Sequence, residues 1–272
     1  MADIIFKVKH NKLVRTILKP YMENRARKRE IEFHKSKYPE KIRKYKNLYK
    51  GQRCFIIGNG PSLKPEDLDR IKEEYTFAAN RIYNIYSETL WRPTFYVSTD
   101  MDILKKEKEN IKKWNHPIMF INYDAKEIFG TDDNNIIYIF LKGKFEKIRN
   151  RFVQNGVSND VSVYSTKTQT VTCVSMELAM YMGFEEIYLL GVDHNFAKYV
   201  GSDGKLVVDK SINSYFSGMK GGDSQAILYV DDTTACYKVV KEYADDNNVK
   251  IYNATRGGKL EVYRRVDFDS II

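Results

Sequence analysis

The residues best suited to chemistry lie in one short stretch, Gly58-Asn59-Gly60-Pro61-Ser62-Leu63. Its two glycines allow a tight turn in which the backbone can approach a ligand without a Cβ in the way. The turn follows the apolar run 54–57 and precedes Lys64-Pro65-Glu66, where a proline and an acid are typical of a first helical turn. A strand, a glycine turn and a helix start together predict an anion site, and the expected ligand is a phosphate group.

The surroundings of this turn narrow the kind of phosphate ligand. The dinucleotide fingerprint Gly-x-Gly-x-x-Gly needs a third glycine, where this chain has Leu63, and an acid about 20 residues later, where it has Asn80. The pattern Gly-x-x-x-x-Gly-Lys-Ser/Thr is absent from the sequence. These departures argue against an NAD enzyme and exclude a P-loop, and they favour a nucleotide site that presents an amide. The alternative is that the glycines only close a turn.

Other polar residues follow apolar segments further along the chain. Asn80, Asp100 and the pair Asp193-His194 each come directly after a run that predicts a buried strand. Because ligands bind outside the carboxyl ends of parallel strands, we expect these side chains and Asn59 to point into one crevice. For any single one of them, the alternative is an ordinary turn or helix-cap residue.

The segments that must position these residues alternate between apolar runs and helical patterns. This alternation predicts an α/β fold, a Rossmann-like parallel sheet with helices on both faces. Strands are expected at 54–57, 76–79, 94–98, 117–121, 136–140, 186–190 and 250–253. Helices are expected from 65 with Leu68, Ile71 and Tyr75 on one face, and at about 102–114, 170–182 and 231–246. We expect an insertion at 141–168 and a polar lid over the site at 198–228.

The composition is that of a folded protein with 43% hydrophobic and 30% charged residues among 272. Three cysteines, Cys54, Cys173 and Cys236, lie far apart without metal-ligand spacing, which fits a reducing compartment. No signal peptide is recognisable, and no apolar run approaches the roughly 18 residues of a membrane-spanning helix. We therefore expect a cytoplasmic location.

The net charge of +9 belongs to the leading segment. Residues 1–50 hold 16 Lys or Arg and 5 Asp or Glu, whereas residues 51–272 hold 29 and 31. We therefore divide the chain into a basic helical segment, 1–50, and a Rossmann-like catalytic domain, 51–272. No nucleic-acid-binding module is recognisable and the body is acidic, so nucleic acid is not an expected partner.

Within residues 1–30, apolar residues from Phe6 to Tyr21 fall on one helical face and most lysines and arginines fall elsewhere. This pattern predicts a basic amphipathic helix that binds a membrane surface, where each Lys or Arg adds about 1 kcal/mol near anionic lipid. Pro20 is expected to end or kink the helix, and 31–50 to contain a second, short one. The alternative is a helix packed on the body with a solvated charged face.

The chain resembles two groups of known proteins in the glycine turn, in Asn80, in the segment 170–193 that ends Gly191-Val192-Asp193, and in the segment 253–262. It resembles the bacterial sialyltransferases of the Campylobacter lipooligosaccharide type. It resembles more closely the broad group, of the DUF115 type, related to motility accessory factors and the archaeal hydroxymethylpterin pyrophosphokinase. The likeness covers most of 51–268.

The resemblance implies a glycosyltransferase that binds a CMP-activated nonulosonic acid, with neither a metal nor another cofactor. Its acceptor would be a glycan or glycolipid at the cytoplasmic face of the inner membrane. Asn59, Gly60 and Ser62 would hold the donor phosphate, and Asn80 would contact phosphate or sugar. Thr170 and Thr172 would lie near the nucleotide ribose. From their places after the predicted strands, we also expect Gly58, Asp100 and Gly191 to bind the nucleotide sugar.

The catalytic base is less clear from the resemblance, because the related sialyltransferases place a histidine in the lid and residues 195–235 contain none. Among the four histidines of the chain, His194 is the candidate base because it follows a strand beside Asp193. Asp193 would orient it, or Asp231 would act in its place. The alternative is that His194 only bonds to the backbone.

Three functions stay open. The favoured one is a glycosyltransferase at the membrane face that acts in lipopolysaccharide or capsule synthesis. The second is a diphosphokinase with ATP and magnesium held by Asp100 and Asp102, a pair that equally suits a metal-dependent transferase of a uridine-diphosphate sugar. The third is a non-catalytic nucleotide-binding scaffold. A homo-oligomer is compatible with each.

Overall fold

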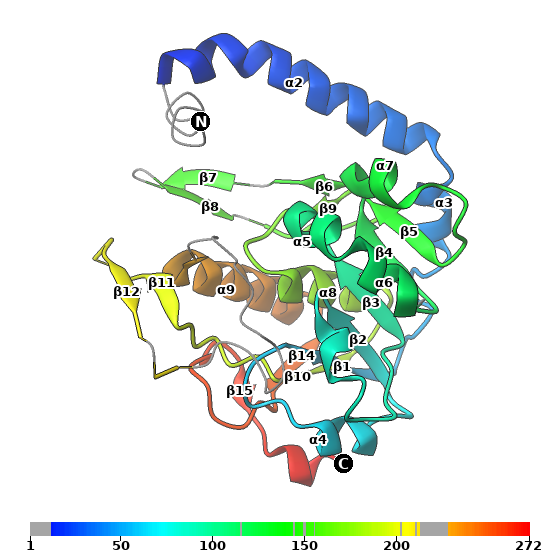
Figure 1. Cartoon of the computed structure of the whole chain (residues 1–272), viewed down its shortest axis with the longest axis vertical. Helices are drawn as coiled ribbons and strands as arrows, with labels where there is room; N and C mark the ends of the chain where they lie inside the picture. The colour runs from blue at the N-terminus through cyan, green and yellow to red at the C-terminus, as the bar shows by residue number, and fades with distance from the viewer. Residues whose placement is uncertain are drawn as a thin grey trace.

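The computed structural model describes residues 12–114, 116–143, 145–148, 151–154, 156–201, 203–209, 211–212 and 228–272. An eight-stranded sheet lies at its centre, in the order β15-β14-β10-β1-β2-β3-β4-β5, and all its neighbouring strands run parallel (Figure 1). Its strands are β1 (Arg53–Ile57), β2 (Tyr75–Ala79), β3 (Phe95–Ser98), β4 (Met119–Asn122), β5 (Ile136–Ile139), β10 (Glu186–Leu190), β14 (Lys250–Asn253) and β15 (Arg264–Arg265).

The strands form where the sequence has short, continuous apolar runs. A parallel sheet covered on both faces buries both sides of each strand, so its strands do not alternate between apolar and polar residues. In β1 and β10, every residue after the first is buried. The predicted α/β fold is confirmed, and each predicted strand is present with its ends shifted by at most two residues. The short edge strand β15 has no apolar run and was not predicted.

The order of the strands creates a switch point beside β1. The chain runs from β1 through β2, β3 and β4 to β5, then returns to the other side of β1 as β10 and continues to β14. Because crossovers between parallel strands are right-handed, the two halves of the sheet carry their helices on opposite faces. A crevice therefore opens outside the carboxyl ends of β1 and β10, where ligands of such folds bind.

The helices are α2 (Lys12–Lys35), α3 (Tyr38–Arg43), α4 (Pro65–Arg70), α5 (Met101–Lys106), α6 (Lys108–Trp114), α7 (Lys126–Phe129), α8 (Val171–Tyr181) and α9 (Val230–Asp246), with short 3-10 helices η1 (Ile82–Ile85), η2 (Tyr123–Ala125) and η3 (Phe268–Ser270). Helix α8 contacts β1, β2 and β3 and packs against α9, which also contacts β14. Buried side chains dominate α8, because it lies between the sheet and other elements.

Smaller strands occupy the two segments expected as an insertion and a lid. The first contains a parallel pair, β6 (Leu141–Lys142) and β9 (Ser165–Thr166), and a hairpin, β7 (Phe145–Ile148) and β8 (Arg151–Gln154). The second contains a three-stranded sheet of β11 (Lys198–Val200), β12 (Leu206–Val208) and β13 (Leu228–Tyr229). Residues 213–227 of the expected lid lie outside the described residues, so its role over the site stays a prediction.

Two predicted helices have different limits. Helix α4 ends at Arg70, so Ile71 and Tyr75 do not continue it, and Tyr75 instead begins β2. The predicted helix at 102–114 is divided into α5 and α6 at Glu107. There the chain turns so that the Glu107 carboxylate accepts hydrogen bonds from Arg81 Nε at 2.8 Å and Tyr83 Oη at 2.7 Å. These contacts come from a distant segment, which helical periodicity does not reveal.

The described part of the basic segment 1–50 contains a long helix, α2, followed by the short helix α3. Helix α2 continues through Pro20 to Lys35, so this proline does not end the helix, and the alternative that it kinks the helix stays a prediction. A proline inside a helix removes one hydrogen bond and crowds the preceding turn, and here it sits at an exposed position where no packing is lost. The side chains of Leu13, Val14, Ile17 and Leu18 and all of Phe6 and His10 lie outside the described residues.

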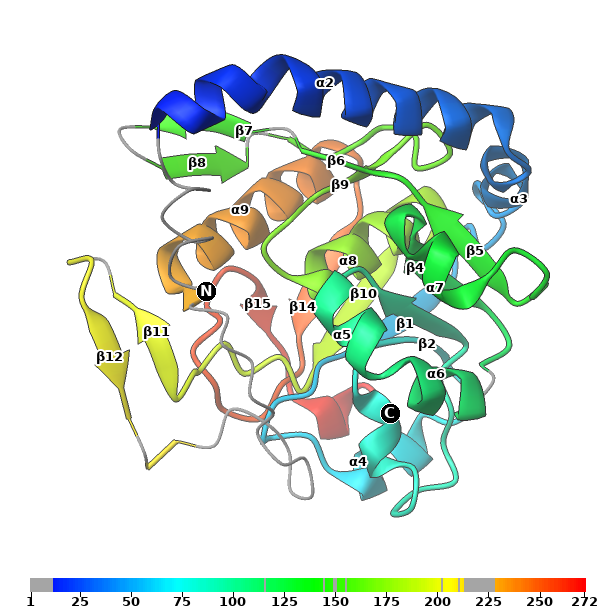
Figure 2. The same ribbon diagram turned by 45° about the horizontal axis from the view of Figure 1, so that its top comes forward.

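The C-terminal part of α2 packs on the body. Phe33 is fully buried and stacks on Phe140, with ring centroids 5.6 Å apart. Arg29 pairs with Asp124 at 2.8 Å and Glu30 with Lys142 at 2.6 Å. Figures 1 and 2 both show α2 extending from this contact over β7 and β8. The division of the chain at residue 50 stays a prediction, since Phe33 belongs to the same core as the sheet.

Within the described residues, no helix is both long and apolar enough to cross a bilayer. The three cysteines are unpaired and buried.

Acid should destabilise the fold through His116. Its side chain is 2% exposed, its Nε2 is buried and has no hydrogen-bond partner among the described residues, and burial lowers its pKa to about 4. In the unfolded chain His116 takes up a proton at about pH 6.5, whereas in the folded chain it does so only at about pH 4. The free energy of unfolding therefore falls as the pH falls between these two values.

Replacing His116 by Phe should remove this dependence. Between pH 7 and pH 4.5, the free energy of unfolding of the parent should drop by about 2 kcal/mol more than that of His116→Phe. Urea unfolding at both pH values measures the difference. Equal drops in the two proteins would show that folding does not lower the pKa of His116.

Candidate functional site

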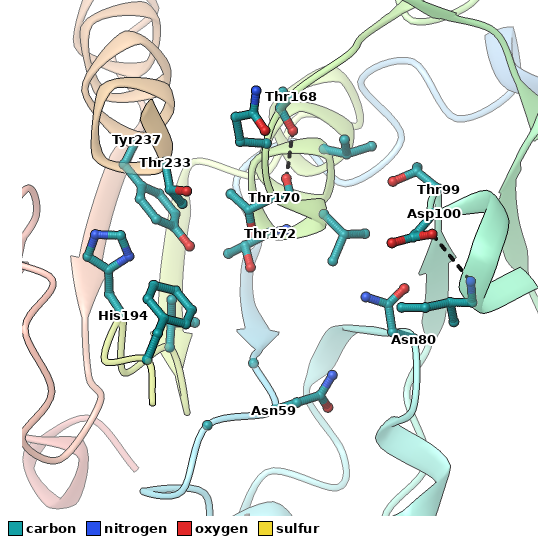
Figure 3. Close-up of a pocket in the computed structure, with 18 of the residues that line it drawn as sticks. Asn59, Asn80, Thr99, Asp100, Thr168, Thr170, Thr172, His194, Thr233 and Tyr237 are labelled. Carbon is teal, nitrogen blue, oxygen red and sulfur yellow. Dashed lines mark hydrogen bonds between the residues drawn. The ribbon is translucent and has the colours of Figure 1, made fainter. Parts of the chain in front are cut away.

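A cleft of about 530 Å³ lies at the carboxyl ends of the central strands, at the switch point. It is lined by residues that follow β1, β2, β3, β4 and β10, by the loop and first turn of α8, and by one face of α9. Figure 3 shows His194, Thr233 and Tyr237 on one side, Asn80 and Asp100 on the other, and the threonines at the start of α8 between them.

The structure brings most of the predicted site residues together. The predicted residues that line the cleft are Gly58, Asn59, Gly60, Asn80, Asp100, Thr170, Thr172, Gly191, Asp193 and His194. Ser62 and Asp231 do not line it. Asp231 is exposed in the first turn of α9, so the expectation that it could serve as the base is not supported by its position.

The glycine turn after β1 holds an anion that belongs to the chain itself. The Asp193 carboxylate accepts a hydrogen bond from Ser62 Oγ at 2.7 Å and one from Ser62 N at 3.4 Å. A Cβ at Gly60 would overlap this carboxylate. Gly60 N also donates to Gly191 O at 2.9 Å. These contacts do not support the expectation that Gly60 and Ser62 hold the donor phosphate, because Gly191 and Asp193 already accept their hydrogen bonds.

Two asparagines at strand ends remain directed at the cleft. Asn59 Nδ2 donates to Ala79 O at 3.1 Å, and its Oδ1 is buried without a hydrogen-bond partner among the described residues. Asn80 has a left-handed backbone, with φ of 56°, and its Oδ1 accepts from Ser98 Oγ at 3.1 Å. Asparagine is one of the few residues that adopt this conformation readily, so Asn80 can turn the chain sharply at the end of β2.

His194 is buried at the end of the cleft that α9 covers. Its exposed fraction is 9%, its φ is 50°, and its ring meets the ring of Tyr237 edge-on with centroids 5.5 Å apart. His194 Nε2 lies 2.8 Å from Thr234 Oγ1, whereas Nδ1 has no hydrogen-bond partner among the residues that the structure describes. Burial lowers the pKa of His194 and so favours the neutral imidazole that a general base requires.

Asp193 does not orient His194, contrary to expectation. The left-handed backbone at His194 turns the two adjacent side chains toward different elements, Asp193 toward the glycine turn and His194 toward α9. Burial raises the pKa of the Asp193 carboxyl, and the hydrogen bonds from Ser62 oppose part of this rise. Asp193 therefore fixes the strand end, and Thr234 supplies the polar contact to the imidazole.

The loop at 253–259 supports the same strand end from the opposite side. Val192 N donates to Thr255 Oγ1 at 3.1 Å and Lys259 N donates to Asp193 O at 2.7 Å. Gly258 has φ of 75°, and a Cβ there would come within 2.7 Å of Asp193 O. The segment that resembled known families in sequence thus holds the residues just before His194.

The start of α8 supplies uncharged donors to the cleft. Thr170 caps this helix by accepting a hydrogen bond from Thr172 N at 3.3 Å, and Thr168 Oγ1 donates to Thr170 O at 2.6 Å (Figure 3). The loop before α8 is tied to the helix by the buried carboxylate of Glu177, which accepts from Ser158 N at 3.0 Å and Thr166 Oγ1 at 2.5 Å. Burial raises the pKa of this carboxyl.

The charged residues of the cleft are few. Among the described residues that line it, Lys167 is the only lysine or arginine, and the acids are Asp100, Asp124 and Asp193. Asp100 Oδ1 caps α5 by accepting from Asp102 N at 2.8 Å. Asp102 is exposed and does not line the cleft. Within the described part of the chain, no three His, Cys, Asp or Glu side chains form a group that could hold a metal ion.

Sequence reasoning missed the contribution of α9. Thr233 and Tyr237, four residues apart, line the cleft, and Thr234 contacts His194. A weak signal existed, because a threonine and a tyrosine four residues apart lie on the same face as the apolar Val240 and Ala244. Phe196 and Gln169, from the flanking loops, also line the cleft and were not predicted.

The fold and the site define a Rossmann-like α/β protein with a ligand cleft at a topological switch point. A family model described as 6-hydroxymethylpterin diphosphokinase MptE-like matches residues 29–199, more than half of the chain. The chain belongs to this family. No curated protein sequence matches it significantly.

Two solved structures with a similar arrangement carry glycosyltransferase names. The MAf glycosyltransferase from Magnetospirillum magneticum AMB-1 is 16% identical with a TM-score of 0.49, and the match covers 86% of this chain and 39% of that one. The sialyltransferase CstII from Campylobacter jejuni, in complex with cytidine-5'-monophosphate, is 15% identical with a TM-score of 0.46, covering 80% and 85%. This chain thus spans well under half of the MAf protein, and likenesses this weak support no functional conclusion.

The overlap between Gly60 and Asp193 can be tested by adding one methyl group. Gly60→Ala should lower the free energy of unfolding by about 2–4 kcal/mol, because the new Cβ would overlap both the Asp193 carboxylate and the backbone oxygen of Gly191. Gly201→Ala is the matched control, since the nearest atom to its Cβ is the exposed Asp203 carboxylate; it should change stability by less than about 0.5 kcal/mol. Urea unfolding measures the free energy of unfolding of both variants. Equal values for Gly60→Ala and Gly201→Ala would contradict the overlap at Gly60.

Proposed function

We propose that the protein is a glycosyltransferase that moves a nonulosonic acid from a CMP-activated donor to a hydroxyl of a glycan or glycolipid. The observation that carries this proposal is the buried His194, whose pKa burial lowers and whose Nδ1 has no partner among the described residues, in a cleft where uncharged polar side chains outnumber charged ones. Membership of a family described by a diphosphokinase supports a phosphate-containing substrate.

In the proposed reaction, the acceptor hydroxyl attacks the anomeric carbon of the donor sugar. The bond between the acceptor oxygen and this carbon forms, the bond between this carbon and the phosphate oxygen breaks, and CMP leaves. His194 Nδ1 takes the hydroxyl proton. Nδ1 is screened from water, so the acceptor must displace a neighbour; the ring of Phe196, edge-on to His194 with centroids 5.4 Å apart, borders the same cleft.

The charge of the cleft favours a donor with a single phosphate. The phosphodiester of a CMP-sugar carries one negative charge, which amide, hydroxyl and backbone donors can stabilise as CMP departs. Asn59, Asn80 and the threonines at the start of α8 offer such groups. The phosphate chains of ATP or a UDP-sugar carry more negative charge and are commonly neutralised by magnesium. Among the described residues that line the cleft, a single lysine, Lys167, could offset that charge.

A pterin-type diphosphokinase is the second candidate, because the family model carries that description. It would need carboxylates for magnesium, and a metal-dependent UDP-sugar transferase would need the same. Asp100 and Asp124 line the cleft, but Asp100 Oδ1 caps α5 and Asp124 pairs with Arg29. Both carboxylates already have partners within the protein, so this pair is poorly suited to binding a magnesium ion.

Calorimetric titration with CMP, UDP, GDP and ATP, each with and without magnesium, separates these candidates. We expect CMP to bind with an affinity that magnesium does not change. Binding of UDP or ATP only with magnesium would overturn the proposed donor and favour the second candidate. Binding of no nucleotide would favour a non-catalytic scaffold.

Replacing His194 should abolish transfer and spare binding. His194→Asn suits the left-handed backbone and should lower kcat by about 100-fold or more, since it removes the general base. The affinity for CMP should stay the same. The same assay of Asp231→Asn tests the alternative base, and a loss there with an active His194→Asn would contradict the assignment.

We further propose that α2 holds the protein at the cytoplasmic face of the inner membrane. The exposed residues Arg25, Arg27 and Lys28 follow Tyr21, which is 64% exposed. Basic side chains beside exposed apolar ones favour an anionic lipid surface. The packed residues from Arg29 onward then connect this surface to the body.

Binding to vesicles tests this role of α2. The triple variant Arg25→Gln, Arg27→Gln and Lys28→Gln should bind phosphatidylglycerol vesicles about 100-fold more weakly, at about 1 kcal/mol per charge. A matched triple change of exposed lysines on α5 and α6, Lys105, Lys106 and Lys112 to Gln, should bind like the parent. Equal losses in both variants would indicate a general effect of charge.

A further inference from the structure

We propose that Thr234 is a positioning residue that fixes the tautomer of His194, so that Nε2 carries the proton and Nδ1 carries the lone pair. This inference deepens the proposed function and rests on it only for the catalytic use of Nδ1. The tautomer itself is a property of the protein without substrate.

The geometry involves three atoms in a row. Thr234 Oγ1 lies 2.9 Å from Val230 O in the preceding turn of α9 and 2.8 Å from His194 Nε2. The Val230 carbonyl can only accept a hydrogen bond, and the hydroxyl has a single proton to donate. When the hydroxyl donates to Val230 O, it can only accept from His194, and Nε2 must then be the protonated nitrogen.

The opposite tautomer satisfies fewer groups. With the proton on Nδ1, Nε2 would need the Thr234 proton, and the contact with Val230 O would lose its hydrogen bond. The Nδ1 proton would also have no acceptor within the described part of the chain, where this atom is buried without a partner. A buried donor without an acceptor is costly. Both hydrogen bonds form only in the first tautomer, which leaves the Nδ1 lone pair as the one ring group without a partner among the described residues.

Other contacts hold the ring in place but leave the tautomer open. The rings of Tyr237 and Phe196 meet the imidazole edge-on, and the strand end before His194 is held by Ser62 and Lys259. None of these contacts distinguishes the two ring nitrogens. The Thr234 hydroxyl does, in the way that carbonyls and carboxylates fix histidine tautomers in many sites. It does so without placing a charge beside the base.

The test is nuclear magnetic resonance of the full chain labelled with ¹⁵N-histidine, without substrate and at a pH where His194 is neutral. Long-range ¹H–¹⁵N correlations identify the protonated nitrogen, and His194→Asn assigns the signal among the four histidines. The parent should show the proton on Nε2. A proton on Nδ1 in the parent would overturn the inference, whatever the activity of the protein.

Two variants complete the test. Thr234→Val keeps the shape and removes the hydroxyl, so the His194 signal should move toward a mixture of tautomers; Thr234→Ser should restore the parent signal. Under the proposed function, kcat should fall about tenfold or more in Thr234→Val and recover in Thr234→Ser, with the KM for the donor unchanged. An unchanged tautomer in Thr234→Val would refute the inference, whereas a changed tautomer without any transfer activity in the parent would refute only the proposed function.

Discussion

The site depends on one interaction, the burial of the Asp193 carboxylate in the glycine turn after β1. The ends of β1 and β10 are level, with Ile57 paired to Leu190, and Gly58 N and Gly60 N extend the pairing beyond the strands. Only glycine at position 60 leaves room for the carboxylate. An anion supplied by the chain holds the turn without a ligand, so the residues around it are fixed before any substrate binds.

Adjacent residues at this strand end have separate tasks. Asp193 faces the turn and joins two strands, whereas His194 faces α9 and presents a neutral imidazole. The left-handed backbone of His194 allows the two adjacent side chains to point toward different elements. Such a conformation persists only where the surrounding structure fixes it. Here the surroundings are Thr255, Gly258 and Lys259 on one side and Ser62 on the other.

The sequence was sufficient to predict the sheet and the position of the cleft. Strands buried on both faces require continuous apolar runs, and residues after parallel strands must meet at one edge, so Asn59, Asn80, Asp100 and His194 were predicted to share a crevice. The glycine turn predicted a site for a phosphate ligand, and no local pattern reveals that the carboxylate of Asp193, 131 positions beyond Ser62, lies there instead. The role of Thr234 depends on how α9 is rotated about its axis, which packing decides and local periodicity does not.

The pairing of β1 with β10 has a consequence for the order in which the chain acquires its structure. The partners of β1 on one side are made soon after it, whereas β10 is synthesised much later, after the whole of β2 to β9. During synthesis, the edge of the apolar strand β1 that will pair with β10 therefore has no partner strand for a long time. Such unpaired edges are prone to association with other chains. The long interval also makes closure of this contact entropically costly. The emerging chain is thus most vulnerable to aggregation in the interval before residue 190 leaves the ribosome.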